Sequence, residues 1–98
     1  MKGSPHTRPI YMLQLFITGA SPNSINAINN VRAICEAYLP DQYSLDIIDV
    51  YQKPWIAASE QLTALPALFK LSPLPVQKMI GNMSDTQKVL KGLHLGNV

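Results

Sequence analysis

The first clear pattern in the chain is an apolar run over residues 11–17, in which Gln14 is the most polar member. Such a run is typical of a strand buried on both faces, as central parallel strands are. The run ends at a turn that contains Gly19, followed by Ser21 and Pro22. Glycine favours tight turns, serine is a frequent helix N-cap and proline suits the first helical position. The pattern predicts a strand that leads directly into a helix.

Helical spacing follows over residues 24–39. Apolar side chains recur there at intervals of three and four residues: Ile28, Val31, Cys35 and Tyr38 or Leu39. Pro40 ends the helix. Residues 43–50 begin as an alternating polar and apolar segment and are predicted to form the second strand. Strand, helix and strand within this length indicate a βαβ unit, with parallel strands and a right-handed crossover.

The second half of the chain gives weaker signals. Residues 55–63 are rich in helix formers and predict a second helix. Residues 64–71 are an apolar strand segment in which Pro66 fits only at a strand start or edge. A proline-rich turn then leads to residues 76–80, a short strand expected to return antiparallel.

The last helix is predicted to begin at Ser84, because Gln87 three residues later completes a capping box, and to stop at Gly96. The element order is therefore β-α-β-α-β-β-α, which is the thioredoxin-like arrangement. We expect an α/β fold in which helices flank a four-stranded mixed sheet. We expect residues 10–96 to form this single domain and residues 1–9 to be a flexible arm, since they lack the apolar core of a signal peptide.

Composition narrows the possible functions. The chain has 98 residues, 47% hydrophobic and 14% charged, with a net charge of +2. Basic residues are scattered singly, which does not favour nucleic-acid binding. No apolar run approaches the roughly 20 residues that would span a bilayer. Cys35 is the only cysteine, so an internal disulfide is impossible and a reducing cytoplasm is the expected location.

The start of the first helix is where thioredoxins carry Cys-X-X-Cys, since free backbone N–H groups there lower a thiol's pKa. The corresponding residues here are Ala20, Ser21, Pro22 and Asn23. Dithiol chemistry is therefore excluded, and Ser21 is interpreted as a structural N-cap in preference to an anion site. Cys35 lies on the apolar side of the helix and is interpreted as core packing.

Other residues that could carry chemistry are isolated. His6 and His94 have no metal-ligand spacing to other cysteines or histidines. Asp46 and Asp49 fall on opposite faces of the second strand, so they do not form an acid–base pair. Trp55 is equally compatible with an exposed binding anchor and with a core residue. We predict no catalytic residue, no metal site and no cofactor.

An ordered series of segments carries a family resemblance without any single specific motif. It comprises residues 11–23, Ile48-Asp49-Val50, Pro54, Ala64 with Pro66, residues 73–76, Lys78-Met79-Ile80-Gly81, Ser84-Asp85, Lys88-Val89-Leu90 and Gly92-Leu93. This series resembles the KaiB family of bacterial clock proteins, without gaps from about residue 11 to residue 95. The resemblance implies a non-enzymatic regulator in circadian or stress-response signalling.

The resemblance also implies partners and residue roles. Family members bind the ATPase ring of KaiC, compete there with a sensor kinase bearing a similar domain, and in some clocks capture KaiA. The implied partner-binding residues are Asn23, Asn26, Glu60 and Gln61, where Gln61 stands in place of a family lysine.

KaiB proteins interconvert between a tetramer-forming fold and a thioredoxin-like monomer. The residues implied to determine the fold are Pro66, Gly92 and His94, and His94 replaces a family aspartate. We predict that the thioredoxin-like form is favoured here, in a divergent member. Two rival interpretations are a degenerate thioredoxin-like or glutathione-type protein that uses Ser21, and a stand-alone sensory domain of a histidine kinase.

Overall fold

The computed structural model describes residues 10–95, so the predicted arm and His6 lie outside the described residues. Within that range the elements follow the expected order. They are β1 (Tyr11–Ile17), α1 (Pro22–Tyr38), β2 (Tyr43–Asp49), α2 (Trp55–Ser59), β3 (Ala67–Ser72), β4 (Gln77–Ile80) and α3 (Thr86–Gly92).

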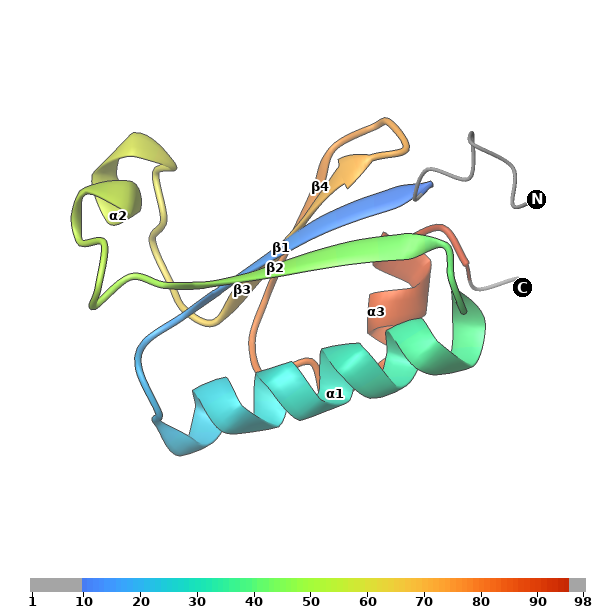
Figure 1. Cartoon of the computed structure of the whole chain (residues 1–98), viewed down its shortest axis with the longest axis horizontal. Helices are drawn as coiled ribbons and strands as arrows, with labels where there is room; N and C mark the ends of the chain where they lie inside the picture. The colour runs from blue at the N-terminus through green and yellow to red at the C-terminus, as the bar shows by residue number, and fades with distance from the viewer. Residues whose placement is uncertain (1–9, 96–98) are drawn as a thin grey trace.

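The strands form one four-stranded sheet in the order β2-β1-β3-β4 (Figure 1). β1 pairs with β2 in parallel, whereas β3 is antiparallel to both β1 and β4. This arrangement confirms the predicted βαβ unit, the mixed sheet and the thioredoxin-like topology. It is the thioredoxin-like form, and not the alternative tetrameric fold, that the chain adopts here.

Helices lie on both sides of the sheet but cover them unequally. α1 and α3 pack on the same face, over a core that includes Leu13, Leu15 and Leu68. On the other face a smaller cluster forms around Phe16 and Phe69, and α2 contributes to its edge. The two phenyl rings meet edge to face with centroids 4.9 Å apart. β1 is buried on both faces only over its second half, from Leu15 to Ile17, whereas Met12 is exposed on the face opposite α1.

Three predicted helix boundaries were wrong. α3 ends at Gly92 and not at Gly96, because Leu93 already caps the helix. α2 ends at Ser59 and not near residue 63, because the chain enters the left-handed region at Gln61, where φ is +55°. α3 is capped by Asp85 and not by Ser84: the Asp85 carboxylate accepts a hydrogen bond from the Lys88 backbone N–H at 3.1 Å. The Ser84 N–H instead donates to Asn82 Oδ1. The capping box with Gln87 is therefore replaced by an aspartate cap, which serves a helix start equally well.

The residues implied to determine the fold lie where α3 and β3 meet the rest of the domain. Pro66 is buried after a cis peptide bond, and its carbonyl accepts a hydrogen bond from Gly81. His94 follows α3 with φ of +62°, and its Nδ1 lies 3.4 Å from Lys70 Nζ. Lys70 is buried, its ammonium donates to the Pro73 carbonyl, and burial lowers its pKa. The sequence pattern of this strand did not predict that Lys70 would be buried.

The Cys35 thiol is expected to react only slowly with thiol reagents in the native protein. Its side chain is fully buried in α1, and burial together with the nearby Glu36 raises its pKa from 9.0 to about 11. At pH 9 the thiolate fraction is then lower by about fifty-fold than in the unfolded chain. Modification by a disulfide reagent should be slower by at least that factor in buffer than in denaturant. Because the folded pKa is the higher one, the stability due to this thiol is lost as pH rises from 9 to 11.

Candidate functional site

Serine hydroxyl groups at the start of α1 form hydrogen bonds with each other and with the adjacent backbone. Ser21 is the N-cap and its Oγ accepts a hydrogen bond from the Ser24 N–H at 3.3 Å, with Pro22 next in the first turn, as predicted. The Ser21 hydroxyl also donates to Ser24 Oγ at 2.8 Å. Ser24 is fully buried and its Oγ accepts from the Thr18 N–H. These bonds close the chain reversal between β1 and α1, so the hydroxyls at the helix start have structural partners.

Asp49, the last residue of β2, holds the turn that follows the neighbouring parallel strand β1. Its Oδ1 accepts hydrogen bonds from the Gly19 N–H and from the Tyr51 N–H, each at 2.9 Å. Gly19 has φ of +58°, and a Cβ there would lie 3.1 Å from the Tyr51 ring. The end of β2 thus holds the turn after β1 in place, which gives Asp49 a definite role at its strand end.

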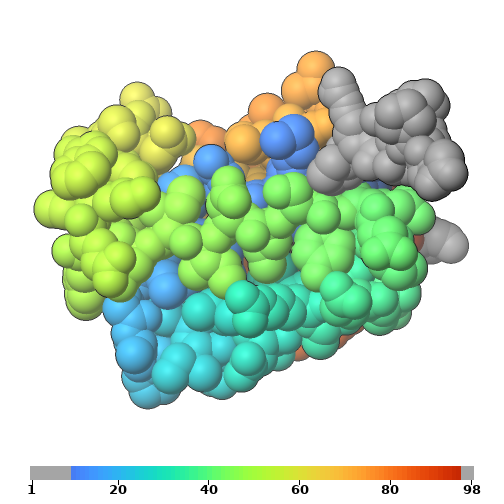
Figure 2. Space-filling view, in the orientation of Figure 1, coloured from blue at the N-terminus to red at the C-terminus, as the bar shows by residue number. Residues whose placement is uncertain are grey.

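The four predicted partner-binding residues are all exposed and lie in two pairs. Asn23 and Asn26 are one turn apart at the start of α1, so they share a side of that helix. Glu60 and Gln61 are adjacent and directly follow α2. Both pairs lie at the end of the molecule where β1 and β2 finish, with α1 and α2 on opposite sides of the sheet (Figures 1 and 2).

Two exposed aromatic residues lie near these pairs: Tyr51 follows β2, and Trp55 is the first residue of α2. Tyr51 is 72% exposed and Trp55 is 64% exposed, so of the two alternatives left open for Trp55 the structure supports the exposed position and not the core position. Tyr51 was not singled out from the sequence, although an aromatic residue two positions after Asp49, just beyond a strand end, was the signal available. Aromatic residues carry much of the binding energy in protein interfaces, and this end of the molecule therefore has the features of a docking surface.

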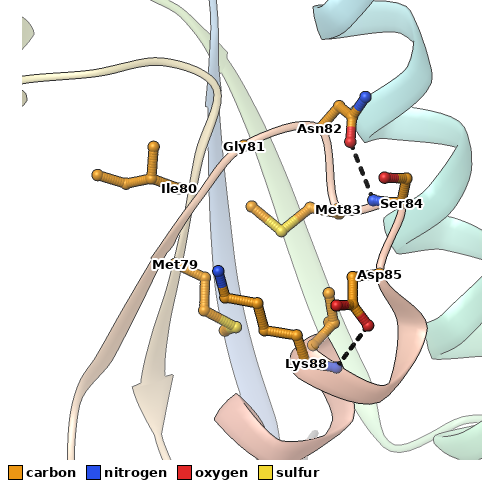
Figure 3. A pocket seen from close by; sticks show the side chains of 9 residues that line it. Met79, Ile80, Gly81, Asn82, Met83, Ser84, Asp85 and Lys88 are labelled. Carbon is orange, nitrogen blue, oxygen red and sulfur yellow. Dashed lines mark hydrogen bonds between the residues drawn. The ribbon is translucent and has the colours of Figure 1, made fainter.

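A separate pocket of about 200 Å³ lies between β4 and α3. Its lining residues are Met79, Ile80, Gly81, Asn82, Met83, Ser84, Asp85, Lys88 and Val89. Figure 3 shows the Lys88 side chain reaching toward the space beside Met79 and Met83, while the carboxylate of Asp85 caps the helix below it. The Asn82 amide oxygen accepts from the Ser84 N–H. Among residues 10–95 no group of three histidine, cysteine or carboxylate side chains is placed to hold a metal.

Fold and site together define a thioredoxin-like domain whose helix-start cysteines are replaced. Solved structures agree on the class: chloroplastic thioredoxin z has a TM-score of 0.70 at 13% identity, covering 92% of this chain and 83% of its own. The N-terminal domain of Synechococcus elongatus SasA has the same TM-score at 25% identity, covering 100% of this chain and 97% of its own. No helix within residues 10–95 has the length and hydropathy to cross a bilayer.

The sequence identifies the family. Residues 14–95 match the KaiB domain, and the chain belongs to the KaiB family. It is 41% identical over 90 residues to the circadian clock oscillator protein KaiB of Prochlorococcus marinus, covering 92% of this chain and 84% of that protein. It is 46% identical over 84 residues to the circadian clock protein KaiB3 of a Synechocystis species, covering 86% and 82%.

Proposed function

We propose that this chain is a non-enzymatic regulatory protein that docks on a ring ATPase of the KaiC type. The observation that carries the proposal is the start of α1 in a KaiB-family domain. The positions of the two thioredoxin thiols are held by Ala20 and Asn23, and the neighbouring Ser21 and Ser24 bond to each other and to the adjacent backbone. Such a helix start can be recognised by a partner but has no sulfur to exchange. KaiA or a sensor kinase would be further members of the same system.

The docking surface that we propose combines the start of α1, the end of β2 and the residues after α2. Asn23 and Asn26 supply amide groups, and Glu60 and Gln61 supply a carboxylate and an amide at an exposed chain reversal. Gln61 stands where the family resemblance implies a lysine, so this position carries no charge in this chain. We propose that the charge at residue 61 sets the affinity for the ring.

Binding of the full chain to a KaiC-type ring ATPase in the presence of ATP tests the proposal. Gln61→Glu is expected to weaken association by about fivefold or more, and Gln61→Lys to strengthen it, because the substitutions have similar length and opposite charge. Asn23→Ala and Asn26→Ala should weaken it as well. Lys91→Ala on α3 is the control and should leave association unchanged.

Failure of the unsubstituted chain to associate with the ring would refute the docking function. Equal affinities for Gln61→Glu and Gln61→Lys would remove that residue from the interface. The glutathione-type alternative makes the opposite prediction: the purified chain would turn over a disulfide or glutathione substrate, and Ser21→Ala would abolish that turnover.

A further inference from the structure

β4 is the last strand of the sheet, so its outer side is paired with no strand within residues 10–95. The pairing with β3 shows which backbone groups point outward. The Gly81 N–H donates to the Pro66 carbonyl at 2.9 Å, and residue pairs of an antiparallel ladder alternate between bonded and non-bonded positions. Lys78 and Ile80 are at the non-bonded positions of this register. Their N–H and C=O groups therefore point away from β3, toward the outer edge of the sheet.

The pocket between β4 and α3 opens beside this edge. Met79 lies between Lys78 and Ile80 in the strand, and its side chain points to the opposite face of the sheet, since side chains alternate along a strand. It packs against the main core and forms one wall of the pocket. A Cβ on Gly81 would meet no described atom within 4 Å beyond its chain neighbours, so there is open space next to the end of β4. A strand added to β4 would direct every second side chain toward this pocket.

The pocket and the edge combine apolar walls with ammonium groups. Figure 3 shows the Lys88 side chain reaching toward the space beside Met79 and Met83. The Asp85 carboxylate, in the same lining, accepts a hydrogen bond from the Lys88 backbone N–H and so serves the cap of α3. On the other face of β4, the Lys78 ammonium lies over the ring of a β3 phenylalanine, 4.9 Å from the ring centroid. Each face of this edge therefore carries a cation that can attract a carboxylate.

We propose that the outer side of β4 binds an extended acidic peptide segment as a further antiparallel strand, with one apolar side chain of the segment in the pocket. The backbone of the segment bonds to the outward N–H and C=O groups of Lys78 and Ile80. The residue opposite Met79 places its apolar side chain in the pocket. An acidic residue opposite Gly81 lies on the same face as Lys88, and a second one lies opposite Lys78. In this mode of recognition the main-chain bonds give affinity and the alternate side chains give specificity.

Charge favours an acidic segment over other occupants of this edge. β4 has only 4 residues, and a short edge strand with a lysine resists pairing with neutral apolar chains. Antiparallel pairing with β4 of a second copy would bring lysines of the two strands together, which is unfavourable. An acidic segment turns the same charge into an attraction. The proposed ring-docking surface includes the end of β2, at the opposite edge of the sheet, so this inference does not depend on it.

Titration of the full chain with a synthetic peptide, followed by NMR, tests the proposal. The probe is acetyl-Thr-Glu-Val-Leu-Glu-Thr-amide, whose valine, leucine and second glutamate are designed to lie opposite Ile80, Met79 and Lys78. We expect a dissociation constant below about 1 mM. At saturating peptide, amide exchange at Lys78 and Ile80 should slow by at least about fivefold, because these two N–H groups gain acceptors.

Modified peptides separate strand addition from simple filling of the pocket. The N–H groups of the valine and the second glutamate face β4 in the proposed pairing, and that of the leucine faces away. N-methylation of the valine and the second glutamate should therefore abolish binding, whereas N-methylation of the leucine should largely preserve it. Equal binding of the doubly methylated peptide would overturn strand addition.

Charge exchange tests the acidic preference. Lys88→Glu should weaken binding of the peptide by at least about fivefold, and a peptide with lysine in place of its first glutamate should recover affinity for this variant. Lys53→Glu makes the same charge change beyond β2, at the opposite edge of the sheet, and should alter binding by less than about twofold.

Three results would overturn the proposal. The first is no binding at millimolar peptide. The second is binding that leaves exchange at Lys78 and Ile80 unchanged or that protects amides of β2 instead. The third is protection of the two amides that rises with chain concentration in the absence of peptide, which would assign this edge to a second copy.

Discussion

Replacing Gly92 by alanine is expected to destabilise the domain by up to about 2 kcal/mol, although alanine is the better helix former. A Cβ at residue 92, in the last turn of α3, would overlap Met79 Sδ and lie 3.1 Å from both Met79 Cγ and Cε. Met79 packs against the main core from β4, so its whole side chain would have to move. The helix-propensity gain of about 1 kcal/mol is smaller than this packing cost.

Urea unfolding of four variants separates the two effects on Gly92. In the Met79→Ala background the clash is absent, so Gly92→Ala should become neutral or stabilising. Lys91→Ala, at the neighbouring exposed position, is the control for the helix and should change stability by less than about 0.5 kcal/mol. An equal loss from Gly92→Ala with and without the Met79 side chain would contradict the steric explanation. We propose on this basis that Gly92 determines how closely α3 can approach β4.

Asp49→Ala should lower the free energy of unfolding by about 2–4 kcal/mol, because one carboxylate oxygen serves two backbone donors. The Gly19 and Tyr51 N–H groups would both lose their acceptor. Asp49→Asn keeps an acceptor oxygen of the same geometry and should lose less than half as much. Asp46→Ala on the same strand is exposed and is expected to cost less than about 0.5 kcal/mol.

Hydrogen exchange at individual amides checks the origin of the Asp49 effect. In Asp49→Ala the Gly19 and Tyr51 amides should lose protection first, while the Ile25 amide, which donates to the Ser21 carbonyl, should exchange as the helix does. Unchanged protection at Gly19 would show that the carboxylate is not what holds the turn. Because these amides border the proposed docking surface, ring binding should weaken in Asp49→Ala even where the chain stays folded.

The first half of the chain could be predicted almost completely, because local and tertiary preferences agree there. The apolar run of β1 belongs to the sheet's centre, and Ser21 with Pro22 start α1 where a cap and an N-terminal proline are expected. A strand, an amphipathic helix and a second strand can bury their apolar sides together in few ways. The replacement of both thioredoxin cysteines was also plain from the sequence.

In the second half of the chain, contacts between residues distant in the sequence determine where the helices begin and end and which side chains are buried. α2 stops at Ser59 because the chain must turn back toward β3, and Asp85 takes the cap from Ser84 because of the path that the β4–α3 loop follows. Periodicity could not show the burial of Lys70, since a lysine in a strand reads as exposed until its neighbours are placed.

Sequence by itself determined the family, the order of elements and the absence of a dithiol, since these depend on residue types and local spacing. Only the tertiary structure decided which side chains meet. Strand pairing aligns four residues of four different strands across the sheet, although these strands are separated along the chain: Asp46, Gln14, Phe69 and Lys78. The contact of Gly92 with Met79 likewise follows from α3 packing on β4. Cross-strand register and helix docking are set by the burial of the whole core, which no local segment specifies.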